Sequence, residues 1–152
     1  MRITHPKPEH LRSMVGLLVQ LCRECDPADD VVIHTSDGNR YPRATREYIY
    51  SSPNWPVIVV EGDKVVGLMI LAMKDLKTIS VRDLIVKKDH RRQGVGRKLL
   101  EHAEKLAKRL NGRVKLHAMQ PAVPFYKRCG YRITRKYEYG CGMLKNIPKR
   151  SV

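Results

Sequence analysis

The sequence predicts an α/β sandwich, in which helices cover one mixed sheet. Apolar residues recur at three- and four-residue steps in residues 8–25 and 96–110, which is typical of amphipathic helices. Around these segments, apolar runs rich in β-branched residues are bounded by Gly, Asp and Asn, which is typical of strands. The elements read β-α-α-β-β-β-α-β-α-β-β. A length of 152 residues suits one domain, so residues 1–152 are predicted to form a single domain.

The first third of the chain is expected to hold a short strand and two helices. Residues Arg2–Thr4 are the expected strand. A helix over Pro8–Cys25 ends at Asp26-Pro27, because proline disfavours helix for the residue before it. Its apolar stripe consists of Leu11, Met14, Val15, Leu18, Leu21 and Cys22. Residues 26–42 are rich in turn formers, and Pro42–Tyr50 is expected to be the second helix.

The rest of the chain alternates strands with helices. Two apolar runs on either side of Gly62-Asp63 predict a hairpin that starts at Pro56. The helix after residue 95 carries Glu and Lys pairs four residues apart on its outer face, and Asn111-Gly112 ends it. The later elements expected are strand Ile79–Val86, helix Gly96–Leu110, strand Arg113–Met119, short helix Val123–Cys129, and strands Tyr131–Tyr139 and Gly142–Ile147.

Composition argues against a disordered chain, a collagen-like repeat and a disulfide-stapled miniprotein. A chain with 42% hydrophobic and 30% charged residues suits a globular domain instead. No apolar run approaches the roughly 20 residues that cross a bilayer, and no apolar stretch follows the basic start, so we expect a cytoplasmic protein without a membrane partner. Cys22 and Cys25 form a C-x-x-C pair, but Cys22 lies on an apolar helical stripe. Free reduced thiols are therefore expected, with no metal.

Positive charge is concentrated in the second half of the chain. The formal net charge is +15, and residues 77–152 hold 21 Lys and Arg against five Asp and Glu. Such a field favours an anionic partner, which nucleic acid, membrane phosphate or a phosphorylated cofactor would each supply. Charge alone does not choose among them.

The most informative segment runs from Asp83 to Glu101. An apolar strand leads into a charged, glycine-rich turn that opens directly into a helix. Gly94 and Gly96 remove side chains where the backbone turns, and the N–H groups of the first helical turn point outward at the positive end of the helix dipole. This arrangement can hold a pyrophosphate, with added charge from three arginines, Arg91, Arg92 and Arg97. The alternative is a tight strand–helix turn with solvated arginines.

Two motifs in this order resemble those of the GNAT superfamily of acetyl-CoA-dependent N-acetyltransferases. The turn Arg91-Arg92-Gln93-Gly94-Val95-Gly96 matches the superfamily signature [Q/R]-x-x-G-x-[G/A], while neither a Walker loop nor a complete G-x-G-x-x-G is present. Downstream, Ala122–Tyr131 is similar to the A-x-x-F-Y-x-x-x-G-F/Y block. The resemblance covers about residues 56–133 well. It implies a mostly antiparallel sheet of six to seven strands, flanked by about four helices, with splayed central strands.

The resemblance implies that the chain binds acetyl-CoA as acyl donor, without a metal, and acetylates a primary amine by direct attack in a ternary complex. The pantetheine arm would run along the backbone of the fourth strand, and the thioester would lie between Ile85 and Leu116. The implied cofactor-binding residues are Leu84, Ile85, Val86, Arg91, Arg92, Gln93, Gly94, Val95, Gly96, Arg97, Tyr126 and Arg128. Tyr126 would be the general acid, since a phenol holds its proton at neutral pH. A packed core aromatic is its alternative role.

The general base is less well defined. Several relatives have Glu-Asp before the apolar triplet of the fourth strand, where this chain has Arg82-Asp83, and an arginine cannot act as a base. Asp83 is therefore the second candidate catalytic residue, its alternative role being a salt bridge with Arg82 or Arg91. His117 is another candidate base, with a structural histidine as the alternative.

Two classes of function remain open from the sequence. The first is an N-acetyltransferase for a small-molecule amine or a protein amino group. The alternative is a basic nucleic-acid-binding or interaction module without catalysis, although its usual motifs are absent. The surplus basic charge could dock an acidic macromolecule or form a solvated face, and a homodimer is left open. Four acidic residues would suit a cationic acceptor, or are ordinary loop polarity: Asp26, Asp29, Asp30 and Asp37.

Overall fold

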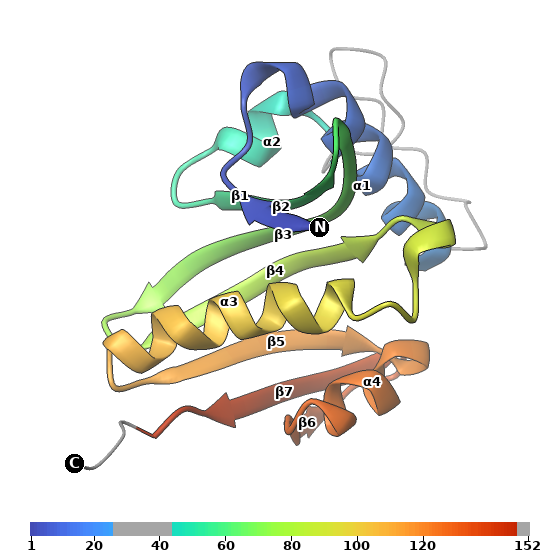
Figure 1. Cartoon of the computed structure of the whole chain (residues 1–152). Coiled ribbons are helices and arrows are strands. Elements are labelled where there is room, and N and C mark those ends of the chain that lie inside the picture. Colours follow the sequence, from blue (N-terminus) through green and yellow to red (C-terminus); the bar gives the residue numbers. More distant parts are fainter. Residues whose placement is uncertain (26–43, 149–152) are drawn as a thin grey trace. The chain divides into compact units, whose positions relative to one another are not determined.

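A computed structural model describes residues 1–25 and 44–148 of the protein (Figure 1). Its helices and strands follow the predicted order. They are β1 (Arg2–Thr4), the 3₁₀ turn η1 (Pro8–His10), α1 (Leu11–Cys25), α2 (Arg46–Tyr50), β2 (Trp55–Glu61), β3 (Lys64–Asp75), β4 (Thr78–Val86), η2 (Lys88–His90), α3 (Val95–Arg109), β5 (Arg113–Met119), η3 (Gln120–Ala122), α4 (Val123–Arg128), β6 (Arg132–Lys136) and β7 (Gly140–Asn146). The four acidic residues between Asp26 and Asp37 lie outside the described residues.

The strands form one seven-stranded sheet in the order β1-β2-β3-β4-β5-β7-β6. The β1–β2, β5–β7 and β6–β7 pairs are antiparallel, whereas β4 and β5 are parallel, with Thr78–Val81 in register with Arg113–Leu116. The predicted α/β sandwich with a mostly antiparallel sheet, a fold of the α+β class, is therefore confirmed. The described residues divide into two compact units, and β3, β4 and α3 each contribute to both.

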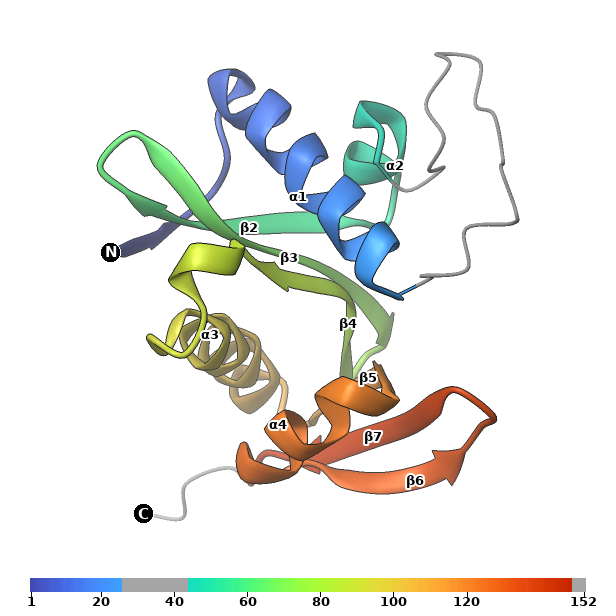
Figure 2. The same cartoon turned by 90° about the vertical axis from the view of Figure 1, so that its right-hand side faces the viewer.

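The first unit contains the described residues of 1–70 together with 83–99. Its main core is formed by α1 and α2 against β2 and β3, with Met14, Leu18, Ile49 and Leu68 fully buried. Figure 2 shows α1 and α2 on one side of β2. The first turns of α3 pack on the other face, because a β carbon at Gly67 would lie 2.7 Å from the side chain of Val95.

The second unit contains residues 71–82 and the described residues from 100 onward. Its core is formed by alternate residues of β5 and β7 under α3 and α4, and Figure 2 shows α4 beside β7. The turn before β5 is tight: a β carbon at Gly112 would lie 1.8 Å from the Lys77 carbonyl oxygen. Hence only glycine fits at this position.

Several boundaries predicted from the sequence are shifted, among them the start of the helix expected over Pro42–Tyr50, which begins at Arg46 after the capping residue Thr45. The strand expected over Tyr131–Tyr139 is shorter and ends at Lys136. The amide of Tyr137 donates a 2.8 Å hydrogen bond to the Gly140 carbonyl oxygen, so residues 137–140 form the turn that joins β6 to β7. The aromatic residues there have high strand propensity, and the turn overrides it.

Tyr131 is a buried residue of the second unit whose hydroxyl group is not hydrogen-bonded within the described ranges. Its side chain is 3% exposed, and its hydroxyl has no hydrogen-bond partner among the described residues. Burial, reinforced by the negative charge of Glu104, raises the pKa of Tyr131 well above its usual range.

Tyr131→Phe is expected to leave the free energy of unfolding unchanged or to raise it by up to about 1 kcal/mol, since it removes an unsatisfied polar group. Urea unfolding followed by circular dichroism measures the change. A loss of more than about 1 kcal/mol would show that the hydroxyl makes a stabilising bond.

Candidate cofactor and catalytic site

The glycine-rich turn has the backbone conformation that a phosphate cradle requires. Gly94 has φ +82°, and its carbonyl oxygen accepts the first hydrogen bond of α3 from the Lys98 amide, at 3.0 Å. The amides of residues 95–97 therefore occupy the first turn, where helix geometry supplies no intrahelical acceptor. A β carbon at Gly94 would meet no atom within 4 Å, so the space beside it is open to a ligand.

Arginine side chains surround this turn, but they do not share one role. Arg92 and Arg97 are exposed, and Arg92 has the left-handed φ of +62° that is rare outside glycine. Arg91 instead binds α1: its Nη2 donates to both carboxylate oxygens of Glu24 at 2.7 Å, and its Nε donates to the Val86 carbonyl oxygen at 3.2 Å. We name this contact the Arg91–Glu24 clamp. Arg91 therefore holds the turn against the end of α1.

The strand residues predicted to contact pantetheine are also engaged in the fold. The Ile85 side chain is buried in the core beneath α1. The carbonyl oxygen of Val86 accepts from Gln20 Nε2, at 3.3 Å, as well as from Arg91. Two donors use both lone pairs of this carbonyl. Val86 thus offers no further acceptor. Leu84 is half-buried, and its contact with pantetheine stays a prediction.

Asp83 lies on β4 and is 4% exposed. The hydroxyl of Tyr48 donates a hydrogen bond to its Oδ2. Tyr48 sits on α2, whose first turn is capped by Thr45 Oγ1, which accepts from the Tyr48 amide at 3.1 Å. Of the two arginines expected as alternative partners, Arg91 binds Glu24 instead. The carboxylate of Asp83 is therefore held in a buried site by a phenol.

Tyr126 lies on α4 in the second unit and is 7% exposed. Its ring contacts Phe125 and Tyr131 edge-on, at centroid distances of 5.1 Å and 6.0 Å. Its carbonyl oxygen accepts from the amides of Cys129 and Tyr131, so the end of α4 is closed around it. Arg128, in the last turn, is exposed. This packing agrees with both roles considered for Tyr126, a general acid and a core aromatic.

His117, the other candidate base, is placed differently. Its side chain is exposed on β5, and its ring lies 5.6 Å from that of Tyr137. It is therefore in a more solvated position than Asp83. Both residues stay candidates for the general base.

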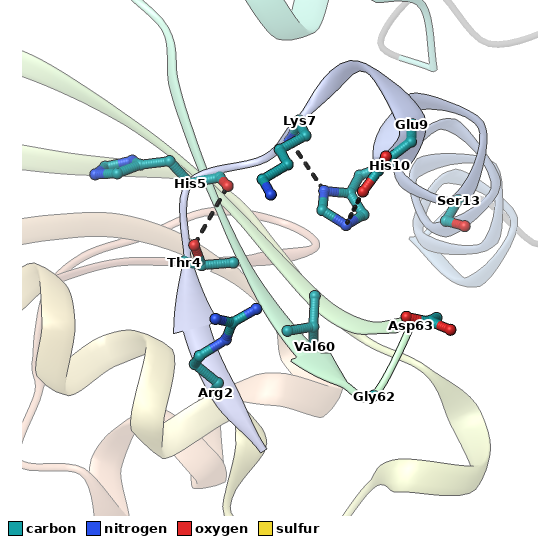
Figure 3. A pocket seen from close by; sticks show the side chains of 10 residues that line it. All are labelled: Arg2, Thr4, His5, Lys7, Glu9, His10, Ser13, Val60, Gly62 and Asp63. Carbon is teal, nitrogen blue, oxygen red and sulfur yellow. Dashed lines mark hydrogen bonds and ion pairs between the residues drawn. The ribbon is translucent and has the colours of Figure 1, made fainter.

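A cavity of about 530 Å³ lies elsewhere in the first unit, between β1, η1 and the turn joining β2 to β3. Figure 3 shows Arg2, Lys7 and His10 pointing toward it. None of the residues predicted for the cofactor site lines this cavity.

Residues 1–25 and 44–148 contain no group of three or more His, Cys, Asp or Glu side chains that could hold a metal ion. No helix within these ranges is both long and apolar enough to cross a membrane.

Sequence patterns did not reveal three residues that support the site: Gln20, Glu24 and Tyr48. Glu24 and Arg91 are 67 residues apart, and Tyr48 and Asp83 are 35 apart. No local periodicity links such distant positions. The one available signal was the position of Gln20 and Glu24, four residues apart near the end of a predicted helix.

Comparisons with known proteins identify the family of the chain. Residues 53–133 match the family model described as an acetyltransferase (GNAT) domain. The chain is 32% identical to the peptidyl-lysine N-acetyltransferase YjaB of Escherichia coli over 117 residues, which are 77% of this chain and 74% of that protein. It is 35% identical to the YjaB protein of Salmonella typhimurium over 92 residues, which span 60% of this chain and only 59% of that relative.

A solved structure extends the likeness to nearly the whole fold. The PaiA N-acetyltransferase from Thermoplasma acidophilum, in complex with coenzyme A, superposes with a TM-score of 0.77 over 95% of this chain and 98% of that one. At 14% identity, this likeness concerns the fold. The matched family model and the E. coli relative carry the assignment: the chain belongs to the GNAT family, a family of acyltransferase enzymes.

Proposed function

We propose that the protein is a single-domain N-acetyltransferase that transfers the acetyl group of acetyl-CoA to the side-chain amine of a protein lysine. The observation that carries the donor assignment is the turn at Gly94, with its left-handed backbone, open space and adjoining helix N-terminus. The acceptor assignment is supported by the two relatives named as peptidyl-lysine N-acetyltransferases.

The donor's pyrophosphate would accept hydrogen bonds from the amides of residues 95–97, and the exposed guanidinium groups of Arg92 and Arg97 would balance its charge. Arg91 would act indirectly, because the Arg91–Glu24 clamp holds the turn in place. The open space at Gly94 fits this use, since the backbone can approach a phosphate closely there.

The proposed chemistry is one displacement. The neutral amine nitrogen attacks the thioester carbonyl carbon, a C–N bond forms, and the C–S bond breaks. Tyr126 would donate its phenolic proton to the departing thiolate. The nitrogen loses a proton to Asp83, directly or through water, and Tyr48 keeps that carboxylate in one orientation.

Asp83→Asn is expected to lower kcat by about 10- to 100-fold and to leave the affinity for coenzyme A unchanged, since an amide cannot accept the proton. Tyr48→Phe should lower kcat without changing the affinity for coenzyme A, because the carboxylate loses the hydrogen bond that orients it. Steady-state kinetics and calorimetry measure the two quantities. A Tyr48→Phe variant with the kcat of the wild type would show that this hydrogen bond does not orient the base.

The function is tested by release of free thiol from acetyl-CoA in the presence of candidate amines. A neutral lysine-containing peptide with a blocked N-terminus should be acetylated faster than a peptide offering only its N-terminal amine, a polyamine or an aminoglycoside. Mass spectrometry should place the acetyl group on the lysine side chain. Turnover with the small amines alone would contradict the protein-lysine acceptor.

A further inference from the structure

One face of the sheet in the second unit is lined by basic side chains. Residues that pair across antiparallel or parallel strands project to the same face of a sheet. Lys115 of β5 pairs with Leu144 of β7, which pairs with Arg132 of β6. In the next row His117 pairs with Gly142, which pairs with Arg135. The basic side chains of the two rows therefore project from the same face of the sheet.

The helices of this unit lie on the opposite side. Lys145, next to Leu144 on β7, projects the other way and binds Glu104 of α3 through an ion pair. Its Nζ also donates to the carbonyl oxygen of Cys129, just after α4, at 2.8 Å. The side that carries Lys115 thus faces away from α3 and α4. Arg132, Arg135 and His117 are exposed, and Lys115 is half-buried.

Two further cations extend this surface. Arg113 precedes Lys115 by two residues on β5, and its Nε donates to Thr78 Oγ1 at 3.0 Å. The ammonium group of Lys74, on β3, is close enough to that of Lys115 to repel it. We call the set formed by Lys74, Arg113, Lys115, His117, Arg132 and Arg135 the basic sheet face. None of the residues in the paired rows is acidic. Within the described residues, the carboxylate that forms an ion pair with this set is Asp75, whose Oδ2 lies 4.0 Å from Arg113 Nη2.

The basic sheet face holds like charges close together. The neighbouring Lys74 ammonium group, with a smaller contribution from Arg113, lowers the pKa of Lys115. Mutual repulsion of this kind is relieved when an anion binds between the groups. The face is therefore complementary to a partner that carries several negative charges.

We propose that the basic sheet face docks an extended acidic segment of the protein whose lysine is acetylated, an inference that rests on the proposed lysine acceptor. Alternate residues of an extended peptide repeat about every 6.6–6.8 Å, as the alternate residues of the strands beneath them do. Carboxylates at alternate positions of the segment would thus meet cations along β5 and β6. Substrates would be selected by acidic sequence near the lysine.

The aromatic side chains of the face favour a polypeptide over single-stranded nucleic acid. Proteins that bind single strands use aromatic rings on which bases stack. Here the Tyr137 ring already contacts the Arg135 guanidinium, 5.3 Å from its centroid, and the His117 ring. These contacts engage the Tyr137 ring, although it is 39% exposed. Among the described residues of this turn, Tyr139, 66% exposed, is then one remaining ring, whereas successive bases would need several.

Docking is measured with a blocked peptide of about ten residues that has glutamate at alternate positions and no lysine. Fluorescence anisotropy should show binding at low ionic strength that weakens as salt is added. The double variant Lys115→Glu, Arg132→Glu should lose at least about tenfold in affinity. Lys115→Gln, Arg132→Gln should lose less, and serves if the charge reversal impairs folding.

The matched control reverses two exposed cations in the first unit, Arg12→Glu and Lys64→Glu. It should keep the peptide affinity within about twofold. If the control loses as much peptide affinity as the Lys115→Glu, Arg132→Glu variant, the proposal is overturned, because net charge alone would then explain binding. Tighter binding of a single-stranded oligonucleotide of equal charge would assign the face to nucleic acid instead and would also overturn it.

A second assay separates docking from the proposed function. The wild type should acetylate a lysine peptide with alternate glutamates at a KM about tenfold below that of a neutral peptide, with a similar kcat. The Lys115→Glu, Arg132→Glu variant should lose this preference and still acetylate the neutral peptide. If the wild type has equal KM values for the acidic and the neutral peptide, docking is refuted and the lysine acceptor stands. If the acidic probe binds but neither lysine peptide is acetylated, the lysine acceptor is refuted and docking stands.

Discussion

Replacing Gly94 by glutamate is expected to weaken coenzyme A binding at least about a hundredfold, or about 2.7 kcal/mol. The new side chain would extend into the space that is open beside Gly94 and would place a carboxylate where we propose that the donor's pyrophosphate binds. A carboxylate there would itself accept from the first amides of α3 and repel the ligand. Isothermal titration calorimetry with coenzyme A measures the loss.

The chain offers a matched control for this substitution. Gly62, in the turn between β2 and β3, also has a left-handed φ, +60°, and an open β-carbon position. Gly62→Glu adds the same charge and a similar backbone strain, so it should lower stability to a similar extent while leaving coenzyme A affinity within about twofold. Unchanged coenzyme A affinity in Gly94→Glu would remove the turn from the proposed site.

The second large effect is expected for Tyr126→Phe. If Tyr126 protonates the departing thiolate, removing its hydroxyl should lower kcat by about 100- to 1,000-fold. Because the aromatic ring and its edge-on contacts with Phe125 and Tyr131 remain, the dissociation constant of acetyl-CoA should change by less than about twofold. Thiol-release assays measure kcat, and isothermal titration calorimetry measures the dissociation constant of acetyl-CoA.

Tyr131→Phe is the control for this prediction. It removes the hydroxyl of another buried tyrosine in the same cluster, and that residue has no proposed part in the reaction. Its kcat should stay within about twofold of the wild type. Equal kcat values for Tyr126→Phe and the wild type would reduce Tyr126 to a packing residue.

The order of elements could be predicted from the sequence because it depends on local patterns. The helix over residues 96–110 and the hairpin about Gly62-Asp63 are each specified by the periodicity of their apolar residues and by the turn residues that bound them. The end of β6 was mispredicted for a physical reason. Tyr137 and Tyr139 favour strands by composition, but the Tyr137–Gly140 hydrogen bond closes a turn there.

The candidate site was only partly predictable. The cradle is local, because Gly94 and the first turn of α3 are adjacent in the chain, so its motif could be identified directly. Contacts between distant surface residues follow from the tertiary packing, and a single sequence does not encode them in any local pattern. The Arg91–Glu24 clamp shows the difference: charge predicted an arginine beside the ligand, and the fold directs that arginine to α1.

The clamp has a thermodynamic consequence for the first unit. Glu24 belongs to the last turn of α1, and Arg91 begins the segment that would receive the donor's phosphates. A ligand that restrains this segment also restrains the helix end, and a change at the helix end alters ligand affinity by the same factor. Amide hydrogen exchange along the last turn of α1 should therefore slow when coenzyme A is added. Through two side chains, the donor would stiffen a helix that belongs to a distant stretch of sequence.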